Sequence, residues 1–236
     1  NQPQDSFDKR LADMQKQLQE QTVVARKALQ QQRDSVVTKT TKASNSFTLN
    51  EELTRILIDE QLREAGWQAD TELLDWRKGA RPEKGVNKAI AECPTYYEGK
   101  NGRADYILFI GLTPVAAIEA KKENVDVSGK IKQAERYAYG FQIDASVAAP
   151  WPLAGHSNPW DDQHGGMYQL PFVYSCNGRE YVPQLAEKSG IWFRDVRHPS
   201  NLSHALSKFH TPDGLLDKLK RRKDEAEAKL KQQGFG

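Results

Sequence analysis

Residues 104–121 constrain the fold most, because they contain two short apolar runs on either side of a turn. The first run covers residues 104–110 and the second residues 115–121, and the sequence between them is Gly-Leu-Thr-Pro. Two such runs around a Gly/Pro turn are typical of a β-hairpin within a largely buried sheet. Helical patterns before and after the hairpin then predict an α/β fold with a mixed sheet flanked by helices.

Three charged residues interrupt the apolar hairpin: Asp105, Glu119 and Lys121. Because side chains alternate along a strand, Glu119 and Lys121 point to the same face. A hairpin that pivots about Leu112 places Asp105 opposite Glu119, with Cβ atoms roughly 4.5–5.5 Å apart. Two converging carboxylates repel each other unless a cation or a proton lies between them. The pattern therefore predicts a metal site.

The ligand types indicate which metal and which reaction. Carboxylate oxygens without nearby His or Cys suit Mg²⁺, with Mn²⁺ as a substitute, and the carbonyl of Ala120 is a candidate third ligand. A lysine beside the metal can position or deprotonate the attacking water and stabilise charge on a phosphate, which predicts phosphodiester hydrolysis by Asp105, Glu119 and Lys121. The alternative is an exposed ladder of ion pairs, and the apolar neighbours at 106–109 and 115–118 argue against it.

Further elements follow from periodicity and turn signals. A core helix is expected over residues 51–65, with Asn50 as its N-cap and Gly66 at its end. A second helix is expected over about 129–139, and two strands over 170–175 and 190–194.

The ends of the chain form helices outside this core. Residues 1–45 are interpreted as a helical arm, either a weak coiled coil or a helix that packs on another domain or subunit. Residues 199–236 are interpreted as a connector that ends in a highly charged helix, for which a solvated linker is the simplest explanation.

Residues 73–102 have little apolar periodicity and several turn formers, which predicts a long surface excursion. Its basic residues Lys78, Arg81 and Lys88 are candidate DNA contacts, and so is Arg179 beyond it. The alternatives are a solvated loop for the first three residues and a turn-stabilising role for Arg179.

Composition excludes some classes of protein. The net charge of +2 is too small to identify a polyanion ligand by itself, and no apolar run approaches the roughly 20 residues that cross a bilayer. The first residues do not resemble a secretory leader, and Cys93 and Cys176 form no disulfide framework. The five histidines have no metal-ligand spacing. A soluble cytoplasmic protein is predicted.

Two short motifs resemble those of known nucleases. The first resembles the PD-(D/E)xK nuclease motif: Asp105 is followed, after thirteen intervening residues, by Glu119-Ala120-Lys121. Ala104 stands where the motif often has Pro. On the next helix, Gln133 and Tyr137 are similar to the QxxxY motif of the RecB-like branch and share one helix face.

A wider resemblance covers about residues 49–198. The segments 53–67, 78–82, 86–92, 175–181 and 189–196 are similar to the restriction (R) subunit of type I restriction-modification enzymes. This resemblance implies a restriction-endonuclease-like domain at 46–198, at the amino-terminal end of a longer R subunit. It implies Mg²⁺-dependent cleavage of double-stranded DNA, giving double-strand breaks together with modification and specificity subunits. ATP would bind only in a following motor, because this chain has no phosphate-binding loop.

The resemblance also implies roles for three further residues. Glu52 would join Asp105, Glu119 and Ala120 at the metal, although it could equally stabilise the N-terminus of its helix, and Glu51 is a weaker candidate. Gln133 and Tyr137 would support the metal site or contact phosphate, while Tyr137 could also be a core anchor. The alternative function is a non-catalytic DNA-binding or assembly module on the same fold, against which the intact Asp105/Glu119/Lys121 set argues.

Overall fold

The computed structural model describes residues 16, 19–28, 51–122, 125–142, 160–161, 167–181 and 183–220. Its helices and strands alternate along the chain, with short 3-10 helices (η) between them. In order they are α2 (Glu51–Glu64), β1 (Gln68–Ala69), η1 (Trp76–Lys78), β2 (Asn87–Tyr97), β3 (Lys100–Ile110), β4 (Thr113–Ala120), η2 (Ser128–Lys130), α3 (Ile131–Gly140), β5 (Trp160–Asp161), β6 (Met167–Tyr168), β7 (Phe172–Cys176), η3 (Pro183–Lys188), β8 (Ile191–Asp195), β9 (His204–Ala205) and α4 (Pro212–Lys220).

Seven strands form one sheet in the order β1-β2-β3-β4-β7-β8-β9, while β5 and β6 pair separately. β1 runs parallel to β2, β4 runs parallel to β7, and the other neighbours are antiparallel. The sheet is therefore mixed. The prediction of an α/β fold with a mixed sheet flanked by helices is confirmed.

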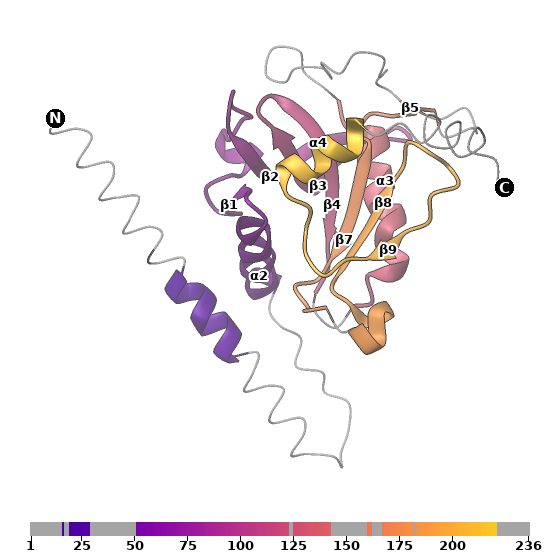
Figure 1. Ribbon diagram of the computed structural model, residues 1–236. Coiled ribbons are helices and arrows are strands. Elements are labelled where there is room, and N and C mark those ends of the chain that lie inside the picture. The colour runs from indigo at the N-terminus through magenta and orange to yellow at the C-terminus, as the bar shows by residue number, and fades with distance from the viewer. Residues whose placement is uncertain are drawn as a thin grey trace, which may run out of the picture.

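Helices cover both faces of the sheet (Figure 1). On one face, Ile58 and Leu62 of α2 and Leu215 and Leu219 of α4 are buried in the same cluster as alternate residues of β3 and β4. On the other face, α3 packs through Ala134 and its neighbours. Because β4 and its partners are covered on both sides, their sequences are almost continuously apolar.

The central hairpin is confirmed, but its turn is shorter than expected. Gly111 and Leu112 alone connect β3 to β4, and Gly111 has a φ of 58°, which suits glycine in a tight hairpin. Leu108 pairs with Ala116 and Phe109 with Pro114, so one extra residue lies between these pairs and forms a β-bulge. Beyond it, Tyr106 pairs with Ile118, and continuing this register places Asp105 opposite Glu119.

The predicted surface excursion over residues 73–102 is wrong. Its second half is β2, an eleven-residue strand that pairs with β3 along most of its length. The small and polar residues of this strand hid it from a search for apolar runs. Pro94, a turn signal in the sequence, lies where β1 no longer pairs with β2, since β1 contacts only Lys88 and Ala89. A proline is tolerated at such an edge position.

The other predicted elements occur with shifted ends. α2 ends at Glu64, and Gly66 follows it with a φ of 91°, as expected for a helix-terminating glycine. α3 begins two residues later than predicted, after η2, and β7 and β8 are the two strands expected after it. Besides β2, the short strands β1, β5, β6 and β9 were not predicted. Among the described residues, every helix is too short or too polar to cross a bilayer.

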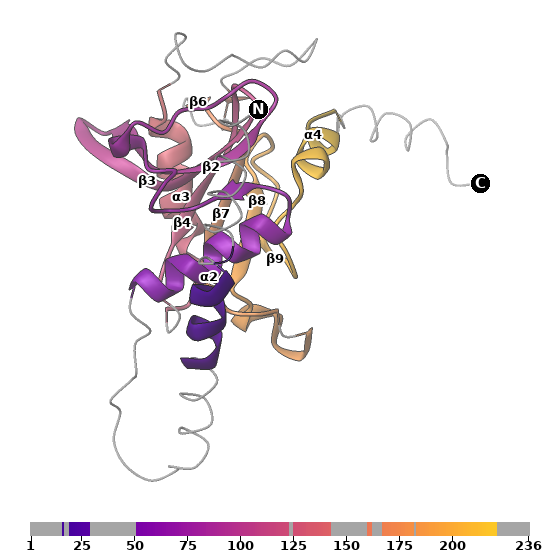
Figure 2. The same cartoon turned by 90° about the vertical axis from the view of Figure 1, so that its left-hand side faces the viewer.

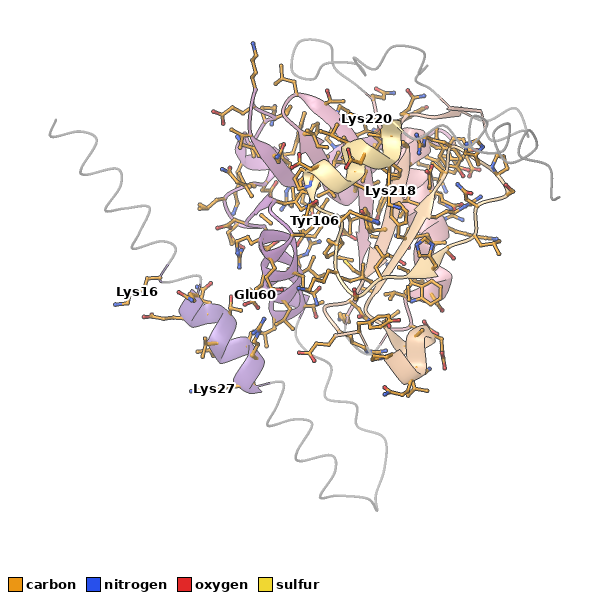
Figure 3. The ribbon with its side chains drawn as sticks, viewed as in Figure 1. Lys16, Lys27, Glu60, Tyr106, Lys218 and Lys220 are labelled. Carbon is orange, nitrogen blue, oxygen red and sulfur yellow. The ribbon has the colours of Figure 1, made fainter. Side chains whose placement is uncertain are left out.

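The described part of the N-terminal arm packs on this same chain. Residues 19–28 are helical, and Ala25 is fully buried in a small cluster with Leu57 of α2. Arg26 forms an ion pair with Glu60 of α2 at 3.1 Å, so the two helices lie against each other (Figures 2 and 3). The remaining arm residues lie outside the described part.

Residues 199–220, the described part of the predicted connector, contribute to the main core. Phe209, Leu215 and Leu219 are buried against the sheet, and the indole nitrogen of Trp67 donates a hydrogen bond to the carbonyl of His210 at 2.9 Å. This segment is thus packed rather than a free linker. The division of the chain into an arm, an endonuclease domain and a connector to a motor stays a prediction.

Candidate active site

The predicted site lies in the middle of the sheet, where β3 and β4 carry Asp105 and Glu119. Arg55 of α2 approaches from one side, and Tyr137 of α3 from the other. The hairpin register explains the meeting of the two carboxylates, and the two helices enclose them. The arrangement therefore depends on the fold rather than on one local motif.

Glu119 is fully buried, with only 1% of its side chain exposed. Lys121, two residues on, forms an ion pair with Glu119 Oε1, as the shared face of the strand allows. Among the described residues, neither oxygen of Glu119 accepts a hydrogen bond of regular geometry. A buried carboxylate normally has such partners, so these two oxygens are suited to a cation.

Asp105 is partly exposed and has two defined contacts. Its Oδ2 accepts a hydrogen bond from the backbone N–H of Ala120 at 2.8 Å, and its Oδ1 lies 3.0 Å from Nη2 of Arg55. Burial raises the pKa of Asp105 to about 7, and the nearby negative charge of Glu119 adds to the rise. The electrostatic conflict expected between two converging carboxylates is therefore present.

Gln133 and Tyr137 meet beside these carboxylates, as their spacing on the helix predicts. Gln133 Nε2 donates a hydrogen bond to the Tyr137 hydroxyl at 3.2 Å. Burial raises the pKa of the Tyr137 hydroxyl, and so do the charge of Asp105 and contact with Glu119. Tyr137 is also packed against the core on this face, so an anchoring role and a site role are compatible.

The other predicted ligands are only partly described. The structure shows the N–H of Ala120 bound to Asp105, and the use of its carbonyl as a ligand stays a prediction. Glu52 lies in the first turn of α2, and its side chain, like that of Glu51, is outside the described part.

Sequence reasoning missed Arg55 and Glu92. Arg55 lies 3.3 Å from Glu92 Oε1 of β2 as well as 3.0 Å from Asp105. The signal for Arg55 was its position three residues before buried Ile58, on the apolar face of α2. Glu92 had no sequence signal, because its importance depends on the pairing of β2 with β3.

The predicted DNA-contacting residues interact mainly with their own neighbours. Lys78 pairs with Glu72 at 2.8 Å, and Lys88 pairs with Glu83 at 2.7 Å. Arg81 stacks on the ring of Trp76, 3.9 Å from its centroid.

Arg179 lies in the turn after β7. Its N–H donates to the side chain of Asn177 at 3.1 Å, as in a side-chain-stabilised turn. DNA contact by Arg179, as by the three residues of the predicted excursion, stays a prediction.

An open cavity of about 290 Å³ adjoins the carboxylates. Its lining includes Thr54 and Arg55 of α2, and Ala120 and Lys121 of β4. Among the described residues, no group of three or more His, Cys, Asp and Glu could hold a metal ion. Two carboxylates with water and a phosphate oxygen are instead a typical environment for Mg²⁺. The residues present therefore fit Mg²⁺ better than a metal that needs an all-protein ligand set.

Comparison with known proteins gives the family. Residues 68–219 match the family described as "Type I restriction enzyme EcoKI endonuclease subunit second domain". The chain belongs to the type I restriction endonuclease-subunit family. The match includes the hairpin, α3 and α4, so it covers most of the residues that enclose the site. The description places this domain second, whereas we expected the amino-terminal end of the subunit.

A curated relative supports membership in the type I endonuclease-subunit family. The type I restriction enzyme EcoKI endonuclease subunit of Escherichia coli (strain K12) is 46% identical over an alignment of 187 residues, and the match covers 74% of this chain. This chain spans only 16% of that relative's length. A solved fragment of a putative HsdR subunit of a type I restriction enzyme from Vibrio vulnificus YJ016 is 26% identical, with a TM-score of 0.41, over 74% of this chain and 26% of the other.

Proposed function

We propose that this chain is the DNA-cutting part of a type I restriction endonuclease subunit and hydrolyses DNA phosphodiesters with Mg²⁺. The observation that carries the proposal is the meeting of Asp105, Glu119 and Lys121, where the carboxylate of Glu119 is fully buried, is ion-paired with Lys121 and accepts no hydrogen bond of regular geometry from the described residues. Family membership supports this reaction over an unrelated use of the same residues.

Each residue of the site has a role in this reaction. Asp105 and Glu119 would hold Mg²⁺, with Mn²⁺ as a substitute, and the bound ion would polarise the phosphate and lower the pKa of the attacking water. Lys121 is ion-paired with Glu119, so we assign it the stabilisation of negative charge that develops on the phosphate. Gln133 and Tyr137 would fix the orientation of Glu119. The water would lose a proton to solvent and attack phosphorus, and the bond to the leaving DNA oxygen would break as that oxygen takes up a proton from solvent.

The assembled enzyme would supply the selection of the DNA site and the ATP-driven motor. We propose modification and specificity subunits as partners that select double-stranded DNA in the cytoplasm, and an ATP-driven motor in the remainder of the subunit. Because a single site cuts one strand, double-strand breaks would need two subunits or two events.

The test uses the full-length subunit in its assembled enzyme with Asp105→Ala and Lys121→Ala. Both variants should lose DNA cleavage by more than about 100-fold while keeping ATP hydrolysis. Lys130→Ala, at an exposed lysine of η2, is the matched control and should cleave normally. Calorimetric titration should show that Asp105→Ala weakens Mg²⁺ binding. Wild-type cleavage by either variant would refute the assignment and favour a non-catalytic DNA-binding or assembly module.

A further inference from the structure

Glu92 has a backbone conformation that is unusual for its residue type and position. It lies in the middle of β2, yet its φ is 58°. This value is in the left-handed region, which disfavours residues other than glycine. The pairs on either side are Ala91 with Tyr106 and Cys93 with Ala104, so Glu92 faces Asp105 at an interruption of the ladder. Backbone strain of this kind persists only where surrounding contacts hold it, and it is concentrated at functional sites.

The strained backbone places the Glu92 carboxylate in a line of alternating charges. Glu92 Oε1 lies 3.3 Å from Nη2 of Arg55, and the same nitrogen lies 3.0 Å from Asp105 Oδ1. On the other side, Glu92 Oε2 lies 4.0 Å from Arg77, which is itself bound to Asp75. All three side chains at the centre of this line, those of Arg55, Glu92 and Asp105, are less than one-fifth exposed.

These contacts hold Arg55 at the edge of the open cavity beside the carboxylates. It lines the cavity together with Lys121, and its guanidinium also lies over the ring of Tyr106, 5.8 Å from the centroid. A planar guanidinium presents five N–H donors in a fork that matches phosphate oxygens, and little freedom is lost on binding when the fork is already oriented. A phosphodiester bound beside Asp105 would therefore meet Arg55 in a fixed orientation.

We propose that Arg55 contacts the phosphate that is cut, and that Glu92 is a positioning residue that holds Arg55 in place for this contact. The inference rests on the proposed function and adds to the site two residues that its sequence motifs do not contain. It also explains why a strained glutamate occupies β2, since a relaxed strand would direct this carboxylate elsewhere.

The first experiment measures single-turnover cleavage of plasmid DNA by the assembled full-length enzyme. Arg55→Gln should lower the rate at saturating DNA and saturating Mg²⁺ by about 100-fold, the usual effect of losing one donor to a developing anion. Arg55→Lys keeps the charge without the fork and should recover part of that loss. If Arg55→Gln is slow only at low Mg²⁺ and reaches the wild-type rate once Mg²⁺ is saturating, Arg55 only supports Asp105, and the phosphate contact is refuted.

A double-mutant cycle tests whether Glu92 acts through Arg55. Glu92→Gln should slow cleavage by about tenfold in the wild-type background and by less than about twofold in the Arg55→Gln background, because coupled residues are not additive. A tenfold loss in both backgrounds would show that Glu92 acts independently and would overturn the positioning role.

Glycine variants separate function from stability at this position. Glu92→Gly relieves the strained backbone, and Glu98→Gly does so at the exposed turn between β2 and β3, where Glu98 has a φ of 49°. We expect the two variants to have melting temperatures within about 3 °C of each other, while Glu92→Gly alone slows cleavage. A much lower melting temperature for Glu92→Gly would mean that Glu92 mainly stabilises the fold.

The two proposals fail in different ways. If Asp105→Ala and Lys121→Ala abolish cleavage while Arg55→Gln and Glu92→Gln cleave like wild type, only the present inference is wrong. If Asp105→Ala cleaves normally, the proposed function itself is wrong, and the effects of the other variants cannot support a role in phosphate binding.

Discussion

Replacing Asp59 with asparagine should change how the stability of this protein depends on pH. Asp59 of α2 is buried and accepts three hydrogen bonds, from the N–H and hydroxyl of Thr71 and from the hydroxyl of Tyr106. Tyr106 lies between α2 and the sheet (Figure 3), next to Asp105 in the sequence. The Asp59 network thus connects the helix that carries Arg55 to the strand that carries Asp105.

The size and sign of the effect follow from the pKa of Asp59. Burial raises this pKa from 3.8 to about 6, against the opposing effect of the hydrogen bonds from Thr71 and Tyr106. At about 1.4 kcal/mol per pKa unit, the rise corresponds to about 3 kcal/mol. Between pH 4 and 6 the folded protein keeps a proton that the unfolded chain has released. The contribution of Asp59 to stability therefore falls as pH rises, by about 2 kcal/mol between pH 4 and 6 and by about 3 kcal/mol in all between pH 3 and 7.

Urea unfolding of the wild type and Asp59→Asn at several pH values between 4 and 7 measures this difference. Asparagine does not titrate, so the stability of the variant relative to the wild type should increase by about 2.4 kcal/mol from pH 4 to pH 7. Other acids, such as Asp75 and Asp126 with their lowered pKa values, contribute equally to both proteins and cancel. A difference that changes by less than about 1 kcal/mol over this range would refute the argument.

Three further predictions concern packing elsewhere in the fold. Gly190→Ala should lower the free energy of unfolding by more than about 3 kcal/mol in urea titrations, because the added Cβ would lie 2.3 Å from a backbone oxygen. Gly129 has open space around it, so the control variant Gly129→Ala should change the free energy of unfolding by less than about 1 kcal/mol. Arg197→Gln should cost about 2–3 kcal/mol, since Arg197 binds two carbonyls at the end of α4 and pairs with a carboxylate at 2.7 Å; a loss below about 0.5 kcal/mol would contradict this. Burial raises the pKa of both thiols, Cys93 and Cys176, so a thiol reagent should label neither in the native protein and both in urea; rapid native labelling would show that the core opens.

The sequence predicted the parts of the site that depend on local pattern. The hairpin, the shared face of Glu119 and Lys121, and the pairing of Gln133 with Tyr137 all follow from spacing within one or two elements. Their functional roles are still predictions, because the structure tests only their positions.

The parts that were missed depend on contacts between distant segments. β2 was mistaken for a loop because it owes its place to pairing with β3 rather than to an apolar run of its own. The role of Glu92 follows from that pairing, and the contact of Arg55 with Asp105 joins residues fifty positions apart. Periodicity cannot reveal such pairs, since it describes each segment alone.

The bulge in the central hairpin changes the number of residues that lie between two opposed residues from even to odd. In a regular hairpin with a two-residue turn, an even number of residues lies between any two opposed residues. Two residues, for example, lie between Ile110 and Thr113. The bulge adds one residue, so beyond it an odd number of residues lies between opposed residues. This is why thirteen residues lie between Asp105 and Glu119. A related chain with twelve or fourteen positions could keep the same carboxylate pair by losing the bulge or gaining a second one. With the same two-residue turn, an odd number of residues between the two carboxylates therefore indicates, from sequence alone, at least one bulge in the hairpin of a relative.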